Sequence, residues 1–480
     1  MHTNRKAVDF RKYMSGRKIA VLGIGISNRP LIRYIHSLGA VITAFDALPD
    51  NDPVLEKTKK SFEEDGIFIS WSCGQNYLDS LPDGGFDFIF RTPKMRPDQP
   101  EIKKAVEKGS ILTSEMEVFM ELCPARIFAV TGSDGKTTTT TLISLILKEA
   151  GYNVYVGGNI GTPLLDQIEK ILDSDMVVLE LSSFQLLTMA KSSDVAVITN
   201  ITPNHLDVHL HYQEYIESKK NIFVNQAFSG RLILNGENEI TRSMYSERRG
   251  KLAYFTWDKD KNISVEASTL YDHAYVKDGV LCYSSEGIEQ EISAEKDIII
   301  PGNHNVENYL AAICATMPFV KSSDISHVAG SFGGVEHRIE LLRKLDGVRF
   351  FNSSIDTSPN RTINTMNALK SRGEHGVLIA GGADKKCDYA GLGTAILAVC
   401  DRIILCGSNA SLIREIVEKE AAGSAFTIAE TTEYSEALIL AKEMARSGEI
   451  VILSPAGTSY DRFRHFEERG NLFKELVAAL

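Results

Sequence analysis

The sequence of 480 residues lacks any apolar run near the roughly 18 residues that a membrane-spanning helix needs. Its first residues are polar and do not predict a signal peptide. Positive charge is also scarce, because 52 lysines and arginines stand against 63 acids, a net charge of −11. Nucleic acids and anionic membranes favour basic surfaces, so we expect neither as the main partner.

Cysteines are few, and their spacing carries no motif. The seven occur singly, without a Cys-x-x-Cys pair, and their number is odd. This pattern suits neither a zinc site nor a disulfide framework. We therefore expect reduced thiols in a cytoplasmic protein.

Short runs rich in β-branched residues, which are typical of buried strands, alternate along the sequence with segments of helical periodicity. At roughly 150 residues per domain, the length suggests about three domains. We predict an α/β fold: a dinucleotide-fold-like N-terminal domain, a central P-loop ATPase-like domain with a mostly parallel sheet, and a Rossmann-like C-terminal domain. The expected domains are 1–114, 115–334 and 335–480. Residues 230–300 look β-rich and polar, which predicts a peripheral elaboration.

The most informative stretch is the loop Thr131-Gly-Ser-Asp-Gly-Lys-Thr-Thr138. A short apolar strand precedes it and an apolar-periodic helix follows, as in a phosphate-binding loop. Lys136 would reach the outer phosphates, and the Thr137 hydroxyl would hold a magnesium ion. Val130 stands where the general motif has its first glycine, so a glycine turn without nucleotide remains an alternative.

A second glycine turn, Gly23-Ile-Gly-Ile-Ser27, lies between an expected strand and helix, and Asp46 follows about 20 residues later. This order is typical of a dinucleotide-binding start. The third glycine of that pattern is replaced by Asn28. The turn therefore fits NAD, another diphosphate ligand or a structural role.

Three polar residues, Glu180, Asn200 and His205, are expected where strands of the central sheet end. Ligands of parallel sheets bind at these carboxyl ends. An acid beside a phosphate loop is a natural magnesium ligand. Taken singly, Glu180 could be a surface acid and His205 a hydrogen-bonded loop residue.

Lys219 falls on the apolar face of its predicted helix, with Tyr212, Tyr215 and Ile216. The pattern alone favours snorkelling, in which the stem is buried and the ammonium reaches water. The alternative is an inward amine whose pKa is lowered by desolvation, able to take up carbon dioxide as a carbamate.

Polar turns end strands of the third segment at 352–359, 381–386 and 454–460. Their hydroxyls, lysines and glycines fit either an anionic small ligand or ordinary helix starts. A further polar segment, 301–308, opens a helix and suits capping or nucleotide contacts equally.

Six motifs together resemble the Mur ligase family over nearly the whole chain, and they look most like its D-glutamate-adding members. They are the phosphate loop, Leu179-Glu-Leu-Ser-Ser-Phe-Gln-Leu186, Asn200-Ile-Thr-Pro-Asn-His-Leu-Asp207, Gly302-Asn-His-Asn305, Glu336-His-Arg338 and Ser454-Pro-Ala456 with Phe466-Glu-Glu-Arg-Gly470. The resemblance implies a ligase that uses ATP to add D-glutamate to UDP-N-acetylmuramoyl-L-alanine through an acyl phosphate. It also implies two magnesium ions and a cytoplasmic enzyme with small-molecule substrates, and we expect a monomer.

The resemblance assigns roles residue by residue. Lys136, Glu180, His205 and Lys219 would be catalytic. Thr137 and Glu180 would bind one magnesium ion, His205 the other, and a carbamylated Lys219 would support the second. ATP would contact Ser133, Asp134, Gly135, Lys136, Thr137, Thr138, Thr139, Asn305, Asn308 and Arg338. The UDP substrate would contact Ser27, Asp46 and Asn159, and D-glutamate Thr357, Lys385, Ser459 and Phe466.

The sequence also departs from the family pattern. In the third domain, Ser353 and Ile355 stand where the family often has an acid and a lysine, and Arg361 or Lys386 are candidate substitutes. In the first domain, Thr92-Pro-Lys94 replaces Ser-Pro-Gly. The competing hypotheses are a ligase of the same superfamily for another amino acid, a regulatory nucleotide-binding protein without catalysis, and a small-molecule kinase.

Overall fold

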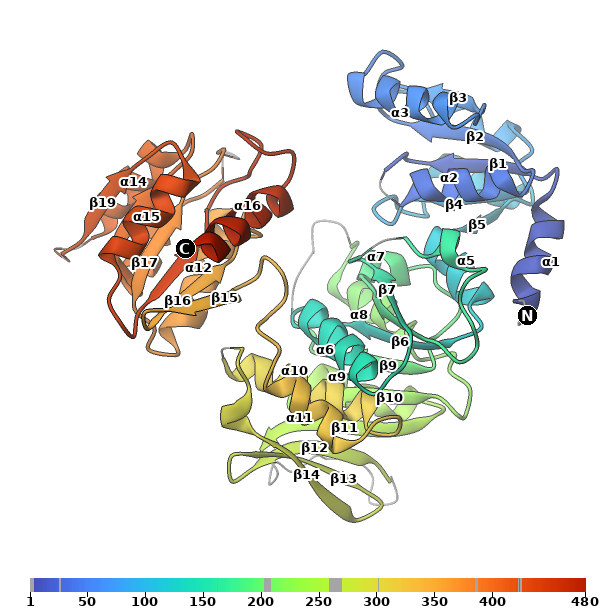
Figure 1. Cartoon of the computed structure of the whole chain (residues 1–480). Helices are drawn as coiled ribbons and strands as arrows, with labels where there is room; N and C mark the ends of the chain where they lie inside the picture. The colour runs from blue at the N-terminus through green and yellow to red at the C-terminus, as the bar shows by residue number, and fades with distance from the viewer. Residues whose placement is uncertain are drawn as a thin grey trace. The chain divides into compact units, whose positions relative to one another are not determined.

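The computed structural model describes residues 4–25, 27–161, 163–202, 209–258, 270–300, 302–384, 387–421, 423 and 425–480. They divide into two compact units. The first comprises the chain up to Ser293 with Glu307–Val328, and the second comprises Ala294–Val306 with Ala329–Leu480. Three sheets and their helices build these units (Figure 1). The predicted α/β class with mostly parallel strands is confirmed, whereas the three domain boundaries stay a prediction.

The N-terminal sheet has five parallel strands in the order β3-β2-β1-β4-β5. Its strands are β1 (Lys18–Leu22), β2 (Val41–Asp46), β3 (Ser70–Cys73), β4 (Phe88–Arg91) and β5 (Ile111–Thr113). Its helices are α1 (Arg5–Met14), α2 (Asn28–Ser37), α3 (Pro53–Glu64), the short η1 (Leu81–Asp83) and α4 (Pro100–Glu107). The strand order reverses between β1 and β4, which is where such sheets bind ligands.

Asn28 explains how the glycine turn after β1 forms without a third glycine. Its buried side-chain amide donates hydrogen bonds to the carbonyl oxygens of Leu22 (3.1 Å) and Gly23 (2.8 Å). Gly23 has a φ of +76°, a conformation that favours glycine. The amide therefore ties the turn to the start of α2.

We expect Asn28→Ala to lower the free energy of unfolding by about 1–3 kcal/mol, because two buried hydrogen bonds are lost. Chemical denaturation would measure the change. Asn51→Ala, at an exposed position of the same domain, is the matched control and should change the midpoint little. Equal midpoints for the two variants would contradict this role of Asn28.

The central sheet has nine strands in the order β14-β13-β12-β11-β10-β9-β6-β8-β7. Its strands are β6 (Arg126–Thr131), β7 (Val154–Gly158), β8 (Met176–Glu180), β9 (Val195–Ile198), β10 (Arg231–Asn235), β11 (Lys251–Asp258), β12 (Asp272–Lys277), β13 (Val280–Ser285) and β14 (Ile288–Ala294). Its helices are α5 (Glu115–Leu122), α6 (Lys136–Glu149), η2 (Leu165–Gln167), α7 (Ser183–Leu186), α8 (Tyr212–Lys220), α9 (Glu239–Ser243), η3 (Met244–Glu247), α10 (Asn303–Thr316) and α11 (Ser322–Ala329). The short η4 (Glu295–Asp297), between β14 and α10, belongs to the second unit.

The expectation that residues 230–300 form a peripheral elaboration is wrong for the first strands of that segment. The strand β10 is buried along its whole length and pairs in parallel with both β9 and β11. It therefore continues the central sheet. Only from β12 onwards does the sheet turn antiparallel, toward β13 at the outer side.

The N-terminal and central sheets share one hydrophobic core. A single cluster of buried side chains includes Ile35 of α2, Phe119 of α5 and Leu179 of β8. The α2 helix also packs against η2. The first two sheets are thus joined by buried apolar contacts as well as by the chain.

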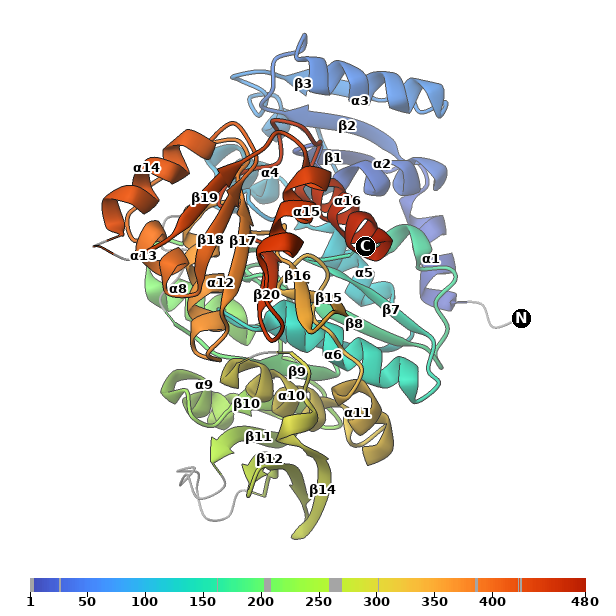
Figure 2. The ribbon, with the colours of Figure 1, turned by 60° about the vertical axis from the view of Figure 1, so that its left-hand side comes forward.

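The second unit contains the C-terminal sheet of six strands, in the order β15-β16-β20-β17-β18-β19. Its strands are β15 (Glu340–Leu345), β16 (Val348–Asn352), β17 (Gly376–Ala380), β18 (Cys400–Leu405), β19 (Thr427–Glu430) and β20 (Ile450–Leu453). Its helices are α12 (Pro359–Lys370), α13 (Leu392–Leu397), α14 (Ala410–Glu420), α15 (Tyr434–Met444) and α16 (Phe466–Ala479). Helices cover both faces of this sheet (Figure 2). The helices α12, α13 and α14 pack over one hydrophobic core, and α15 and α16 pack over another.

Within the described residues, no helix is long and apolar enough to cross a membrane. All seven cysteines are free thiols, and only Cys387 is exposed.

Candidate active site

The phosphate loop joins β6 to α6, as predicted, and its glycines are required by its surroundings. Gly135 caps α6 in a left-handed conformation with a φ of +79°. A Cβ atom at this position would clash with Asn308 Oδ1, and one at Gly132 would clash with Thr199 Oγ1. Close packing on both sides therefore holds the loop at the carboxyl end of β6.

The neighbouring strand end also fixes the loop. The amide of Ser133 donates to the carbonyl oxygen of Asn200 at 2.9 Å, and the amide of Asp134 donates to Asn200 Oδ1 at 2.9 Å. The Ser133 hydroxyl lies 2.8 Å from the hydroxyl of Tyr215 on α8. Asn200, expected at a strand end, thus supports the phosphate loop.

Lys136 curls back over the loop. Its Nζ lies 3.0 Å from the carbonyl oxygen of Gly132 and 2.8 Å from that of Ser133. The ammonium is therefore placed above the loop, beside the positive N-terminus of α6. This is the arrangement expected for binding phosphate oxygens.

Thr137 and Glu180 come together, as the magnesium prediction requires. The Thr137 hydroxyl donates to Glu180 Oε2 at 2.7 Å, and Glu180 is 2% exposed. Hydroxyl and carboxylate oxygens are the ligands that magnesium prefers beside phosphates. Among the described residues, no group of three or more His, Cys, Asp or Glu gathers as a metal site. The Thr137 hydroxyl and the Glu180 carboxylate fit an ion that also binds phosphate oxygens.

Asn159, predicted to contact the UDP substrate, forms hydrogen bonds with Glu180. Its amide Nδ2 donates to Glu180 Oε1 at 2.8 Å, and its backbone amide donates to the Glu180 carbonyl oxygen at 2.8 Å. The side chain orients the carboxylate that faces Thr137. Its predicted contact with the UDP substrate stays a prediction.

Lys219 is buried, and the snorkelling interpretation is wrong. Only 1% of the residue is exposed, and its Nζ donates to the carbonyl oxygen of Gly132 at 2.9 Å and contacts Thr131 Oγ1 at 3.2 Å. Burial, followed by the charge of Lys136, lowers the pKa of Lys219 well below its usual value, while the charges of Asp134 and Glu180 oppose this shift. The amine therefore lies at the phosphate loop and not in water.

The remaining predicted ATP contacts are distributed over both units. Thr139 is buried and donates to Asn308 Oδ1 on α10 at 3.1 Å, while Thr138 follows Thr137 in the first turn of α6. Asn305, also on α10, and Arg338 belong to the second unit. Their contacts with ATP stay predictions. His205 and Lys385, like the candidate substitute Lys386, lie outside the described residues.

In the N-terminal sheet, the predicted UDP residues flank the switch point between β1 and β4. Asp46 Oδ2 accepts a hydrogen bond from the amide of Ile24 at 2.8 Å, so this acid shapes the glycine turn. Ser27 is the N-cap residue of α2. The amide of Thr92, after β4, donates to the carbonyl oxygen of Leu22 at 3.1 Å and closes the other side.

In the second unit, a buried arginine of the Phe466-Glu-Glu-Arg-Gly470 motif, to which the sequence assigned no role, joins the predicted D-glutamate turns. The Arg469 guanidinium is 1% exposed and donates to the carbonyl oxygens of Ser354 (2.9 Å) and Gly457 (3.2 Å). These turns carry Thr357 and the buried Ser459. The turn 353–358 is also tied to α16, since Ser354 Oγ donates to the carbonyl oxygen of Phe466 at 2.7 Å.

The altered turn of the third domain is well packed despite its departures. Ser353 is fully buried, and its hydroxyl accepts a hydrogen bond from the amide of Ile339 at 3.3 Å. The neighbouring Asp356 is buried and bonded to Ser454 Oγ at 2.7 Å, and burial raises its pKa. Arg361 donates to the carbonyl oxygen of Ile355 at 2.8 Å, which places a cation beside the position of the missing lysine.

Comparison with known proteins agrees with this geometry. The model of the Mur ligase middle domain matches residues 130–316, and that of the Mur ligase glutamate ligase domain matches residues 337–457. The chain therefore belongs to the Mur ligase family. The UDP-N-acetylmuramoylalanine–D-glutamate ligase of Acetivibrio thermocellus is 50% identical over an alignment 481 residues long that covers 99% of this chain and 99% of that one. Within the family, the chain thus groups with the ligases of that name.

Solved structures share the fold at low sequence identity. The UDP-N-acetylmuramate–alanine ligase of Thermotoga maritima superimposes with a TM-score of 0.53 at 18% identity, covering 96% of this chain and 99% of that one. FolC of E. coli, solved with DHPP and ADP, gives a TM-score of 0.53 at 17% identity, covering 76% and 92%. At these identities the likeness extends to the fold alone.

Proposed function

We propose that the protein uses ATP to join D-glutamate to UDP-N-acetylmuramoyl-L-alanine. The two joined substrates are those in the name of its relative in Acetivibrio thermocellus, UDP-N-acetylmuramoylalanine–D-glutamate ligase. The observation that carries the chemistry is the gathering of Lys136, the Thr137–Glu180 pair and Lys219 around one phosphate loop. A loop with a lysine above it, oxygen ligands for magnesium and a buried amine from a second lysine is equipped for phosphoryl transfer.

The proposed reaction has two steps. The terminal carboxylate of UDP-N-acetylmuramoyl-L-alanine attacks the γ-phosphorus of ATP, so that an acyl phosphate forms and ADP leaves. The amine of D-glutamate then attacks the acyl carbon, loses a proton, and the tetrahedral intermediate expels inorganic phosphate to leave an amide. Lys136 would neutralise charge on the transferred group.

Magnesium would lower the charge repulsion between the acceptor carboxylate and the triphosphate. Thr137 and Glu180 fit one ion by their distance and chemistry. The family resemblance adds His205 for a second ion, with a carbamylated Lys219 in support. The depressed pKa of Lys219 favours a neutral amine, which is the form that reacts with carbon dioxide.

Most of the remaining proposed contacts with the substrates lie at the N-terminal and C-terminal sheets. The UDP group would bind at the β1/β4 switch point with Ser27 and Asp46, and D-glutamate would bind the third domain with Thr357, Lys385, Ser459 and Phe466. Asn159 would contact the UDP substrate, and Asn305, Asn308 and Arg338 would contact ATP. Seven free thiols favour a cytoplasmic setting.

Phosphate release from ATP tests the function directly. Purified protein, magnesium and UDP-N-acetylmuramoyl-L-alanine would be assayed with D-glutamate, L-glutamate, L-alanine or lysine, with omission of the UDP substrate as the control. We expect release with D-glutamate alone. Release only with another amino acid would keep the ligase chemistry and reject D-glutamate, and no release from protein that binds ATP would reject the ligase activity.

A further inference from the structure

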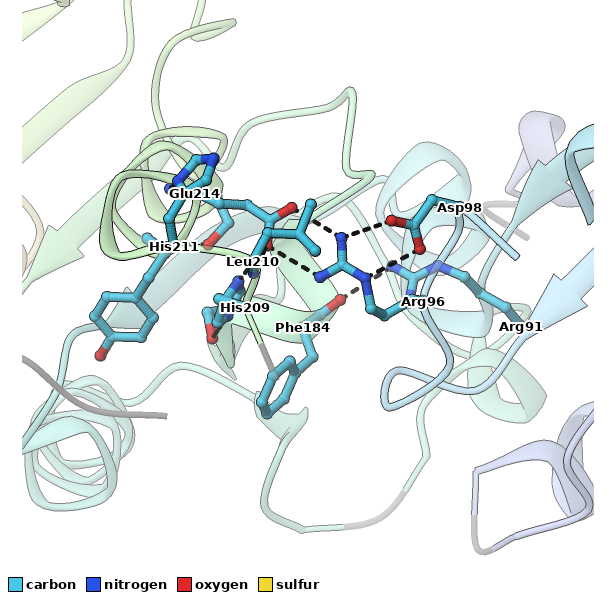
Figure 3. A network of polar contacts seen from close by, with 11 residues as sticks. Arg91, Arg96, Asp98, Phe184, His209, Leu210, His211 and Glu214 are labelled. Atoms are coloured by element: carbon cyan, nitrogen blue, oxygen red, sulfur yellow. Dashed lines mark hydrogen bonds and ion pairs between the residues drawn. The ribbon is translucent and has the colours of Figure 1, made fainter. Parts of the chain in front are cut away.

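The segment 91–98, which begins at the last residue of β4, leaves the N-terminal sheet and contacts two helices of the central sheet (Figure 3). We call it the interdomain strap. It begins at the β1/β4 switch point, where the amide of Thr92 donates to the carbonyl oxygen of Leu22. The strap therefore starts at the proposed UDP site and ends on the central sheet.

Arg91 anchors the start of the strap. Its buried guanidinium donates to the strap's own carbonyl oxygens at Pro93 (3.0 Å) and Met95 (3.1 Å). The same group donates to the carbonyl oxygen of Phe184 at 3.0 Å and to Thr188 Oγ1 at 2.8 Å. One side chain thus shapes the strap and attaches it to α7.

Arg96 attaches the far end of the strap to α8. Its guanidinium donates two hydrogen bonds to the Glu214 carboxylate, both of 3.0 Å, and two to the Asp98 carboxylate, of 3.0 and 2.9 Å. The Arg96 and Glu214 side chains are only 20% and 18% exposed. A bidentate and partly buried pair holds a more defined geometry than an ordinary surface ion pair.

Through His209, Glu214 is also connected to Ser183 of α7. Its Oε2 lies 3.2 Å from His209 Nδ1 and accepts from the amide of Leu210 at 2.9 Å, while His209 Nε2 lies 2.9 Å from Ser183 Oγ. Hydrogen bonds from Arg96 lower the pKa of Glu214 to about 2, so its carboxylate only accepts. Nδ1 of His209 therefore carries the proton, and since burial lowers the pKa of His209, Nε2 accepts from Ser183.

The residues at the end of this network stand close in sequence to the proposed phosphoryl-transfer groups. Ser183 comes three residues after Glu180, which ends β8. Glu214 lies in the first turn of α8, and Lys219 in its last turn. A displacement of α8 would move Lys219 relative to the Gly132 carbonyl that it contacts.

We propose that Arg96 and Glu214 are positioning residues, which hold the interdomain strap against α8 so that a substrate bound at the β1/β4 switch point meets the phosphate loop. The proposal rests on the proposed function and extends it to residues that touch neither substrate. It predicts that loosening the pair harms the use of the UDP substrate more than the use of D-glutamate.

The test compares Arg96→Gln, Arg96→Lys, Glu214→Gln and the double variant Arg96→Gln/Glu214→Gln. The matched control is Arg33→Gln, which breaks the exposed pair with Asp65 in the same domain. We expect kcat/KM for UDP-N-acetylmuramoyl-L-alanine to fall about tenfold in Arg96→Gln, because small misplacements of reacting groups are costly. The KM for D-glutamate should change less than about twofold. Arg96→Lys should lie between, since lysine lacks the planar fork.

The double variant should be little worse than either single variant, because one interaction is lost in all three. A merely structural role would instead lower the melting temperature and the fraction of active enzyme while leaving every KM unchanged. Losses that add in the double variant, or a folded Arg96→Gln that equals Arg33→Gln, would overturn the proposal.

Calorimetric titration with UDP-N-acetylmuramoyl-L-alanine, without an amino acid, separates this proposal from the proposed function. We expect Arg96→Gln to bind UDP-N-acetylmuramoyl-L-alanine more weakly than the wild-type protein does, whichever amino acid the enzyme adds. If that amino acid is not D-glutamate, only this part of the proposed function is wrong. A wild-type protein that binds no UDP substrate would overturn both.

Discussion

Lys136→Ala is expected to lower kcat for phosphate release by about 10³-fold, the scale of losing a group that stabilises the transition state. The side chain folds over the loop carbonyls of Gly132 and Ser133, where the outer phosphates would lie, and it is only partly buried. We therefore expect the variant to stay folded. Steady-state assays with saturating ATP, beside circular dichroism of the same sample, would measure both effects.

Lys148→Ala is the matched control, because it removes an exposed lysine from the last turn of the same helix. It should release phosphate at the wild-type rate. If folded Lys136→Ala were as active as this control, the assignment of the phosphate loop would be wrong.

Lys219→Ala is expected to reduce kcat about 100-fold, and short carboxylates such as formate or acetate should restore part of it. The truncation leaves a buried space beside Gly132 that a small carboxylate can fill in place of the carbamate. In the intact protein, the neutral amine would add to carbon dioxide and release one proton. With ¹³C-labelled bicarbonate, a carbamate carbon signal should appear in wild-type protein.

The neighbouring Lys220→Ala is the control for this series. Lys220 pairs with Glu217 and Glu247 on the surface, so its loss should neither stop the reaction nor create a response to carboxylates. Absence of both rescue and the carbamate signal would leave Lys219 as a buried amine that only braces the loop at Gly132 and Thr131.

The sequence predicted the strands and the phosphate loop because these features are local. Buried β-branched runs such as Val195–Ile198 need both faces covered, and a strand–glycine–lysine–helix order has few alternatives. The order of strands, and the addition of β10 to the central sheet, depend on pairing between distant segments, which periodicity does not record.

Side-chain partners were harder to predict than elements. Helical spacing placed Lys219 on the apolar face of α8, but only the fold shows that the Gly132 carbonyl lies there to accept its hydrogen bond. The sequence assigned no role to Arg91, and Arg469 stood out only as part of the motif Phe466-Glu-Glu-Arg-Gly470. Their burial becomes visible only when carbonyl oxygens from segments far apart, such as Phe184 for Arg91 and Ser354 for Arg469, converge on them.

The segments of the two units alternate along the sequence, which has a consequence for folding during synthesis on the ribosome. The first unit includes Glu307–Val328, which follows a segment belonging to the second unit. Because domains fold largely as they emerge, the first unit cannot be completed until α10 and most of α11 have been translated. A nascent chain ending before residue 307 would carry the phosphate loop while Gly135 and Thr139 still lacked Asn308. Nucleotide binding would thus mature late, shortly before the C-terminal sheet begins to form.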